Sequence, residues 1–156
     1  MGISRPIGLT RTLVGFVLVA SCGCSKPTPT MLTLAPAGMN PQGPCIADAS
    51  GGVAFWGNGS LQSKAYLEKG PVTITMRARG NTVDGEAPVV LVDLEARVVG
   101  KLVIDSPAIK DFTFTTSAQD SGVAVLGITF SNHLAKPNPL EGRYLYIEMV
   151  SVKQAG

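Results

Sequence analysis

The chain has 156 residues, of which 45% are apolar, 6% aromatic and 15% charged. This length allows one ordinary domain after an export segment and excludes a large multidomain enzyme. Thirteen Lys and Arg residues stand against 11 Asp and Glu residues, and Arg5 and Arg11 precede an apolar run near the N-terminus. Without those two, basic and acidic residues are equal in number and no basic block remains, so the composition excludes nucleic-acid binding.

Residues 1–21 have the three parts of a secretory signal: a basic head, a short apolar stretch over 12–20, and small residues before a break. The stretch is about half of the roughly 20 residues that a spanning helix needs, so it predicts export. Residues 19–22 (VASC) resemble a bacterial lipobox. We therefore expect a signal peptide over 1–21 and a lipid anchor on Cys22 that holds the protein to the periplasmic or cell-surface side of a membrane. The alternative is an ordinary signal cleaved nearby, with Cys22 as a stray thiol.

Residues 22–44 are rich in Pro, Thr, Gly and Ala and show no sustained period of 2 or 3.6. This composition predicts an extended spacer, followed by one domain over residues 45–156. Cys24 and Cys45 either form a disulfide in an oxidising compartment or remain free thiols, and both interpretations stay open. The Cys22/Cys24 spacing does not indicate zinc, because neither residue has a His neighbour.

Short β-favouring runs recur between turn signals in residues 45–156. The clearest covers 72–79, where Val72, Ile74 and Met76 alternate with polar residues. The other expected strands cover, in chain order, residues 61–68, 88–94, 97–104, 111–116, 123–131 and 143–152. Some eight closely spaced strands, with no helical stretch of comparable quality, predict an all-β fold: an antiparallel β-sandwich with jelly-roll-like topology.

Several motifs follow one another in a characteristic order: residues 56–59 (WGNG), 72–80 (VTITMRARG), 84–85 (DG) with Pro88, 111–114 (DFTF), 128–132 (ITFSN) and 141–147 (EGRYLYI). Together they resemble the calcium-dependent xylan-binding carbohydrate-binding modules over roughly residues 52–152. The resemblance implies a β-sandwich that binds polysaccharide without cleaving it.

The resemblance also implies that acidic side chains of two late loops hold a Ca²⁺ ion, which coordinates sugar hydroxyls. In the family pattern, carboxylates stand where this chain has His133 and Gly142. Asn132 and Glu141 still offer oxygens as metal ligands. One remaining carboxylate makes a weak site for a hard cation, so the sequence favours loss of calcium.

The ligand-binding residues that we expect lie around the Pro-containing loop 136–139, where loop residues carry function on a rigid scaffold. They are Asn132, His133, Asn138, Glu141, Arg143 and Tyr144. Tyr144 either offers a flat face to a sugar or, like Tyr146, covers the sandwich edge.

Trp56 is the only Trp. It is either a stacking platform for the ligand or a core plug, and its place before a turn favours the core plug. Phe55 and Trp56 point in opposite directions if they share a strand, so we expect one of them to be buried.

The predicted function is non-catalytic binding of a xylan-like β-glycan by a lipid-anchored domain in the bacterial cell envelope. An enzyme is not expected, because His133 is the only His and no Gly-x-Ser-x-Gly elbow is present. The acidic pairs Asp84/Glu86 and Asp93/Glu95 could each share a face, but glycoside hydrolysis needs two carboxylates across a cleft, and a small sandwich with short loops offers little cleft. The alternative is an envelope scaffold that binds another protein and no glycan.

Overall fold

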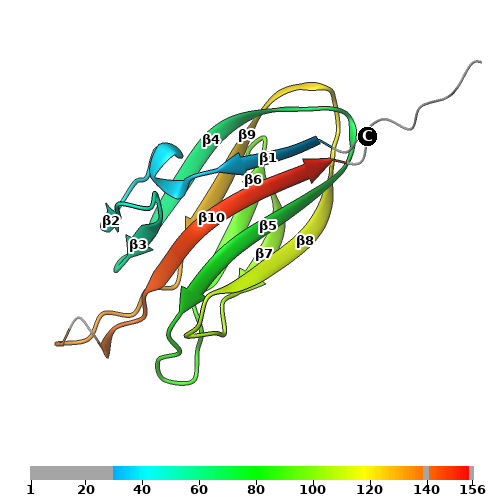
Figure 1. Cartoon of the computed structure of the whole chain (residues 1–156). Helices are drawn as coiled ribbons and strands as arrows, with labels where there is room; N and C mark the ends of the chain where they lie inside the picture. Colours follow the sequence, from blue (N-terminus) through cyan, green and yellow to red (C-terminus); the bar gives the residue numbers. More distant parts are fainter. Residues whose placement is uncertain (1–29, 139–140, 155–156) are drawn as a thin grey trace, which may run out of the picture.

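A computed structural model describes residues 30–138 and 141–154, which form two antiparallel sheets packed face to face (Figure 1). One sheet contains β1 (Thr30–Leu34), β2 (Cys45–Ala47), β3 (Val53–Phe55), β5 (Gly70–Gly80), β8 (Lys110–Ala118) and β10 (Leu145–Gln154). The other contains β4 (Gly59–Leu67), β6 (Val89–Leu94), β7 (Arg97–Val103) and β9 (Gly122–Phe130).

The strand order is β2-β3-β10-β5-β8 in the first sheet, with β1 beside β10, and β4-β9-β6-β7 in the second. From β3 onward, every connection except the β6–β7 hairpin crosses from one sheet to the other. These crossings produce a jelly-roll-like sandwich. The predicted all-β fold is confirmed.

Strand β5 forms where the alternation predicted it. Val72, Ile74 and Met76 are at most 1% exposed and face the core between the sheets. Thr73 and Thr75 point to the outer face, and the hydroxyl oxygen of Thr75 lies 2.8 Å from that of Thr113 on β8. The period of 2 therefore separates a buried face from a polar face, as expected for an antiparallel sheet with one solvated side.

The predicted spacer was wrong for residues 30–44, which belong to the domain. β1 pairs antiparallel with β10, with Thr30 opposite Gln154 and Leu34 opposite Val150. A short 3₁₀ turn, η1 (Pro36–Gly38), follows, and Met39 is 1% exposed in the core. Backbone pairing with β10 and burial of Met39 fold this segment, and neither leaves a mark in its composition.

Four of the sequence predictions fall wholly or partly on residues 1–29, which lie outside the described residues: the signal peptide, the Cys22 anchor, the Cys24 thiol and residues 22–29 of the spacer. Cys45 is half-buried at the start of β2, and the disulfide with Cys24 and the free thiol both stay hypotheses. Within residues 30–138 and 141–154, no helix is long and apolar enough to cross a membrane.

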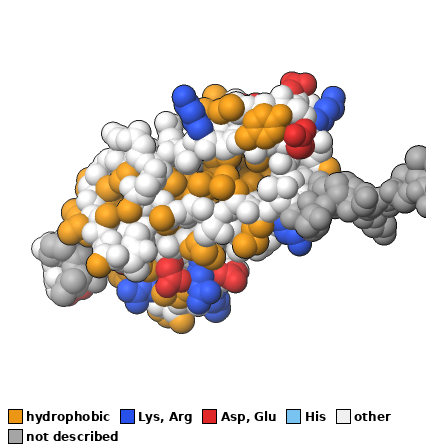
Figure 2. Space-filling view, turned by 45° about the horizontal axis from the view of Figure 1, so that its top comes forward, with side chains coloured by type: hydrophobic (Ala, Val, Ile, Leu, Met, Phe, Trp, Pro, Cys, Tyr) orange, Lys and Arg blue, Asp and Glu red, His pale blue; other side chains and the backbone are white. Residues whose placement is uncertain are grey.

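Hydrophobic side chains also reach the surface, and Figure 2 shows them gathered in the middle of one face, with most charged groups near its rim. On the outer face of the four-stranded sheet, Tyr66 and Val123 are 64% and 66% exposed. The two residues lie opposite each other in β4 and β9. They mark an apolar stripe, which lies at the opposite end of these two strands from the β3–β4 connection.

Candidate functional site

Four chain connections meet at one end of the sandwich: residues 56–58, 81–88, 104–109 and the β9–β10 connection, of which residues 131–138 and 141–144 are described. The strand register places them together, because Phe55 and Gly80 both lie opposite Leu145, and Gly59 and Val90 both lie opposite Phe130. All of the predicted ligand-binding residues lie in or beside these connections.

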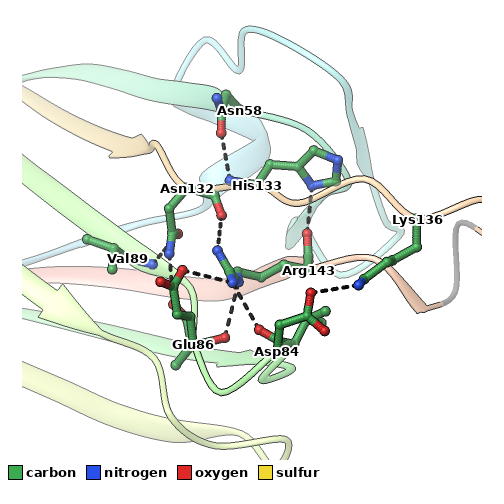
Figure 3. A network of polar contacts seen from close by, with 10 residues as sticks. Asn58, Asp84, Glu86, Val89, Asn132, His133, Lys136 and Arg143 are labelled. Carbon is green, nitrogen blue, oxygen red and sulfur yellow. Dashed lines mark hydrogen bonds and ion pairs between the residues drawn. The ribbon is translucent and has the colours of Figure 1, made fainter.

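The Arg143 side chain ties two of these connections together (Figure 3). The residue is 3% exposed, and its guanidinium donates to the backbone carbonyls of Val83, Glu86 and Asn132 at 3.0, 3.1 and 2.5 Å. It also forms an ion pair of 3.0 Å with the exposed Glu86 carboxylate. Arg143 is therefore a buried structural residue and not the ligand contact that the sequence predicted. The loop carbonyls around it need a donor, and a guanidinium supplies several in one fork.

Asn132 is occupied in the same way. Its side-chain oxygen accepts from the backbone N–H of Val89 at 2.7 Å, and its side-chain nitrogen donates to the carbonyl of Ala87 at 2.9 Å. Both ends of the amide thus hold residues 87–89 against the β9–β10 connection. These hydrogen bonds give Asn132 a structural role, and a contact of its oxygen with a metal or a sugar stays a prediction.

His133 is fixed at its backbone and at its ring. Its backbone N–H donates to the side-chain oxygen of Asn58 at 2.8 Å, and its Nδ1 lies 2.7 Å from the carbonyl oxygen of Arg143. Because a carbonyl only accepts, Nδ1 carries a hydrogen. In the neutral imidazole, Nε2 is then an acceptor for another group.

The WGNG motif positions Trp56 through close backbone packing. The backbone N–H of Trp56 donates to the carbonyl of Pro44 at 3.1 Å. A Cβ on Gly57 would come within 2.6 Å of the Pro44 ring, and one on Gly59 within 2.5 Å of the Gln42 carbonyl oxygen. Asn58 between them caps His133. Each residue of the motif after Trp56 thus has a structural reason.

Trp56 is 47% exposed, whereas Phe55 is 1% exposed. The core-plug interpretation of Trp56 was therefore wrong, and the expectation that one of the two neighbours is buried is confirmed.

Trp56 lines a hollow of about 210 Å³, here named the loop-end hollow, together with His133, Ala135, Lys136 and Gly142. Sequence reasoning missed Lys136, whose Nζ lies 2.6 Å from Oδ2 of Asp84.

The remaining predicted contacts lie close to this hollow without lining it. The side-chain amide of Asn138 donates to the Glu141 carboxylate at 3.0 Å, and both residues are exposed. Tyr144 is half-buried, and its backbone N–H donates to the side-chain oxygen of Asn81 at 2.7 Å. Contacts of these three residues with a ligand stay predictions.

In one interpretation of the sequence, Tyr144 and Tyr146 both cover the edge of the sandwich. In the structure, Tyr146 orders the β2–β3 turn. Its hydroxyl donates to Oδ2 of Asp48 at 2.6 Å, and the Ser50 hydroxyl donates to Oδ1 at 2.6 Å. These two hydrogen bonds, that from Ser50 first, lower the pKa of Asp48 from 3.8 to about 2. The hydrogen bond to Asp48 raises the pKa of Tyr146.

The donor set at this end of the sandwich does not fit a calcium ion. Calcium requires six to eight oxygen ligands, usually with several carboxylates. The Asn132 oxygen is already hydrogen-bonded, Gly142 has no side-chain oxygen, and Glu141 alone contributes a carboxylate among the positions implied by the resemblance. Within the described residues, no group of three or more His, Cys, Asp and Glu side chains is arranged to hold a metal.

No family model and no curated protein matches the sequence. Solved structures do match. The CBM36-1 domain of a multidomain xylanase from the hindgut metagenome of Trinervitermes trinervoides is 16% identical, with a TM-score of 0.65 over 83% of this chain and 99% of that chain. A CBM36 carbohydrate-binding module in complex with calcium and xylotriose is 12% identical, with a TM-score of 0.63 over 78% and 98%.

A carbohydrate-binding module (CBM6cm-2) from Cellvibrio mixtus lichenase 5A, in complex with cellotriose, is 12% identical, with a TM-score of 0.59 over 80% of this chain and 98% of that chain. A family two carbohydrate esterase from Cellvibrio japonicus also matches, but over only 34% of its own length. The chain thus has the fold of these carbohydrate-binding modules along nearly their whole length, and it resembles the enzyme only in part.

Proposed function

We propose that the protein binds a polysaccharide without cleaving it, and that the ligand is a β-glycan of the xylan class. The observation that carries the proposal is Trp56, which lies half-exposed beside a hollow with a polar rim on a carbohydrate-binding-module fold. An indole ring offers a flat apolar face for the C–H groups of a sugar, and the polar groups beside it fix orientation.

The polar rim suits sugar hydroxyls. Lys136 supplies N–H donors, and the His133 ring, whose Nδ1 is held by the Arg143 carbonyl, leaves Nε2 for a ligand. The network around Arg143 fixes the loops that carry these groups. Binding in this proposal requires no metal, because the oxygens that calcium needs are missing or already hydrogen-bonded.

Titration calorimetry with xylo-oligosaccharides, in the presence of calcium and again with a chelator, tests this function. We expect binding, with affinities that differ by less than about twofold between the two conditions, because no calcium site supports the sugar contact. An affinity that the chelator abolishes would contradict the metal-free mechanism. Absence of binding to xylan, to other β-glycans and to envelope polysaccharide would contradict glycan binding altogether.

The alternative function, an envelope scaffold that binds another protein, is favoured by one observation. Tyr66 and Val123 form an exposed apolar stripe on the four-stranded sheet, far from the loop-end hollow. A contiguous apolar patch that is exposed to solvent often marks a site of protein–protein contact. If no glycan binds, this stripe is the first surface to mutate.

We also propose that the protein is exported and held to a bacterial membrane by lipid on Cys22. The support is the signal-like segment before residue 22 and the lipobox-like VASC sequence. Metabolic labelling with a fatty acid should mark the wild-type protein and leave Cys22→Ala unlabelled. Equal labelling of both proteins would exclude the assignment.

A further inference from the structure

The polar groups of the loop-end hollow are mainly hydrogen-bond donors, and one is a cation. Lys136 contributes an ammonium group and Trp56 an indole N–H, which only donates. None of its five lining residues, Trp56, His133, Ala135, Lys136 and Gly142, is acidic. A site that is rich in donors complements a ligand that is rich in acceptors.

Lys136 is held in place before any ligand arrives. Its side chain is 31% exposed, and its ammonium lies 2.6 Å from Oδ2 of Asp84 (Figure 3). An ammonium has three N–H donors, and this ion pair engages one of them. The pair reduces the side-chain entropy that a flexible lysine would lose when it binds a ligand.

Two of the nearby carboxylates form ion pairs, and a third accepts a hydrogen bond from a neutral amide. Asp84 pairs with Lys136, and Glu86 pairs with the buried Arg143 guanidinium. Glu141 accepts from the amide of Asn138. The two positions where this sequence has His133 and Gly142 in place of carboxylates both line the hollow, so neither repels an anion there.

From this arrangement we infer that the loop-end hollow selects a glycan unit that carries a carboxylate, such as a uronic acid branch on a xylan-like chain. The sugar ring packs on Trp56, and its carboxylate accepts from the Lys136 ammonium. A charge-assisted hydrogen bond of this kind is stronger than one to a neutral hydroxyl. The inference rests on the proposed function and adds the charge of the ligand to it.

The test compares three ligands of equal backbone length by titration calorimetry: a xylo-oligosaccharide with one glucuronic acid branch, the same molecule with its carboxyl group reduced to an alcohol, and the unbranched chain. The acidic and reduced forms differ only in charge and one oxygen. At low salt we expect the acidic form to bind about tenfold more tightly than the reduced form. High salt should narrow the difference, because it screens exposed charges.

Three substitutions and one control assign this preference to the ion pair. Lys136→Gln should lower the ratio of acidic to reduced affinities to about one. Asp84→Asn should raise that ratio several-fold, because it removes the carboxylate that competes with the ligand for the ammonium. Asn also tolerates the positive φ of 53° at this position. Lys136→Arg should retain the preference, which separates loss of charge from damage to the loop, and Lys101→Gln on β7 is the matched control.

The possible outcomes separate the two proposals. If the wild-type protein binds the acidic and reduced forms equally, the carboxylate inference fails while glycan binding stands. If none of the three ligands binds, the proposed function fails. If the preference survives Lys136→Gln with the fold intact, another cation recognises the carboxylate and the assignment to Lys136 is wrong.

Discussion

Replacing Arg143 with alanine should lower the free energy of unfolding by about 2–4 kcal/mol. The substitution removes the donors for the backbone carbonyls of Val83, Glu86 and Asn132 at once. Hydrogen bonds from a charged group contribute more than neutral ones, and acceptors left without partners inside a protein keep their desolvation cost. Water entering the space left by the side chain offsets part of the loss.

Urea denaturation of wild type and Arg143→Ala measures this effect. The matched control is Arg77→Ala, whose guanidinium forms an ion pair of 2.6 Å with Glu148 but is 49% exposed. An exposed pair contributes little, so this control should change the free energy of unfolding by less than about 1 kcal/mol. Similar stabilities of Arg143→Ala and Arg77→Ala would show that the buried guanidinium does not hold the loops together.

Trp56→Ala should weaken binding of xylo-oligosaccharide by about 10- to 100-fold. Loss of a stacked aromatic face and of the apolar area that it covers corresponds to about 1.5–3 kcal/mol. The Trp56 side chain is half-exposed, so its removal should leave the fold largely intact. Calorimetry gives the affinity, and urea denaturation of the same variant checks the fold.

Tyr66→Ala is the control for this experiment. Tyr66 is 64% exposed, and it lies on the four-stranded sheet, near the end of the sandwich opposite to the loop-end hollow. Its removal should change the affinity by less than about twofold. If Tyr66→Ala weakens binding and Trp56→Ala does not, the glycan binds to the face of the four-stranded sheet and the loop-end hollow is not the site.

The sequence predicts the parts of this fold that depend on local pattern. In β5, alternation alone indicates that Val72, Ile74 and Met76 face the core, and the structure buries all three. The segment that contains β1 and Met39 has no such pattern. It folds because β10 offers it an unpaired edge, which is a property of a strand more than 100 residues later in the chain.

The site is predictable only in its location. The motifs place the expected ligand-binding residues around the loop 136–139, and of these residues His133 lines the hollow beside Trp56. The inward direction of Asn132 and Arg143 depends on backbone carbonyls that other loops bring to them. No property of the residue types in that stretch distinguishes a polar side chain that meets a ligand from one that caps the chain's own backbone.

The place where β1 enters the sandwich determines how the domain would be held. Thr30 lies opposite Gln154, at the other end of β10 from Leu145 and the loop-end hollow. The ten residues of β10 separate these ends by roughly 30 Å. With lipid on Cys22, as proposed, the eight steps to Thr30 reach at most about 29 Å. Such an anchor would hold the Gln154 end of β10 within this distance of the bilayer, and Trp56 lies at the opposite end of the sandwich.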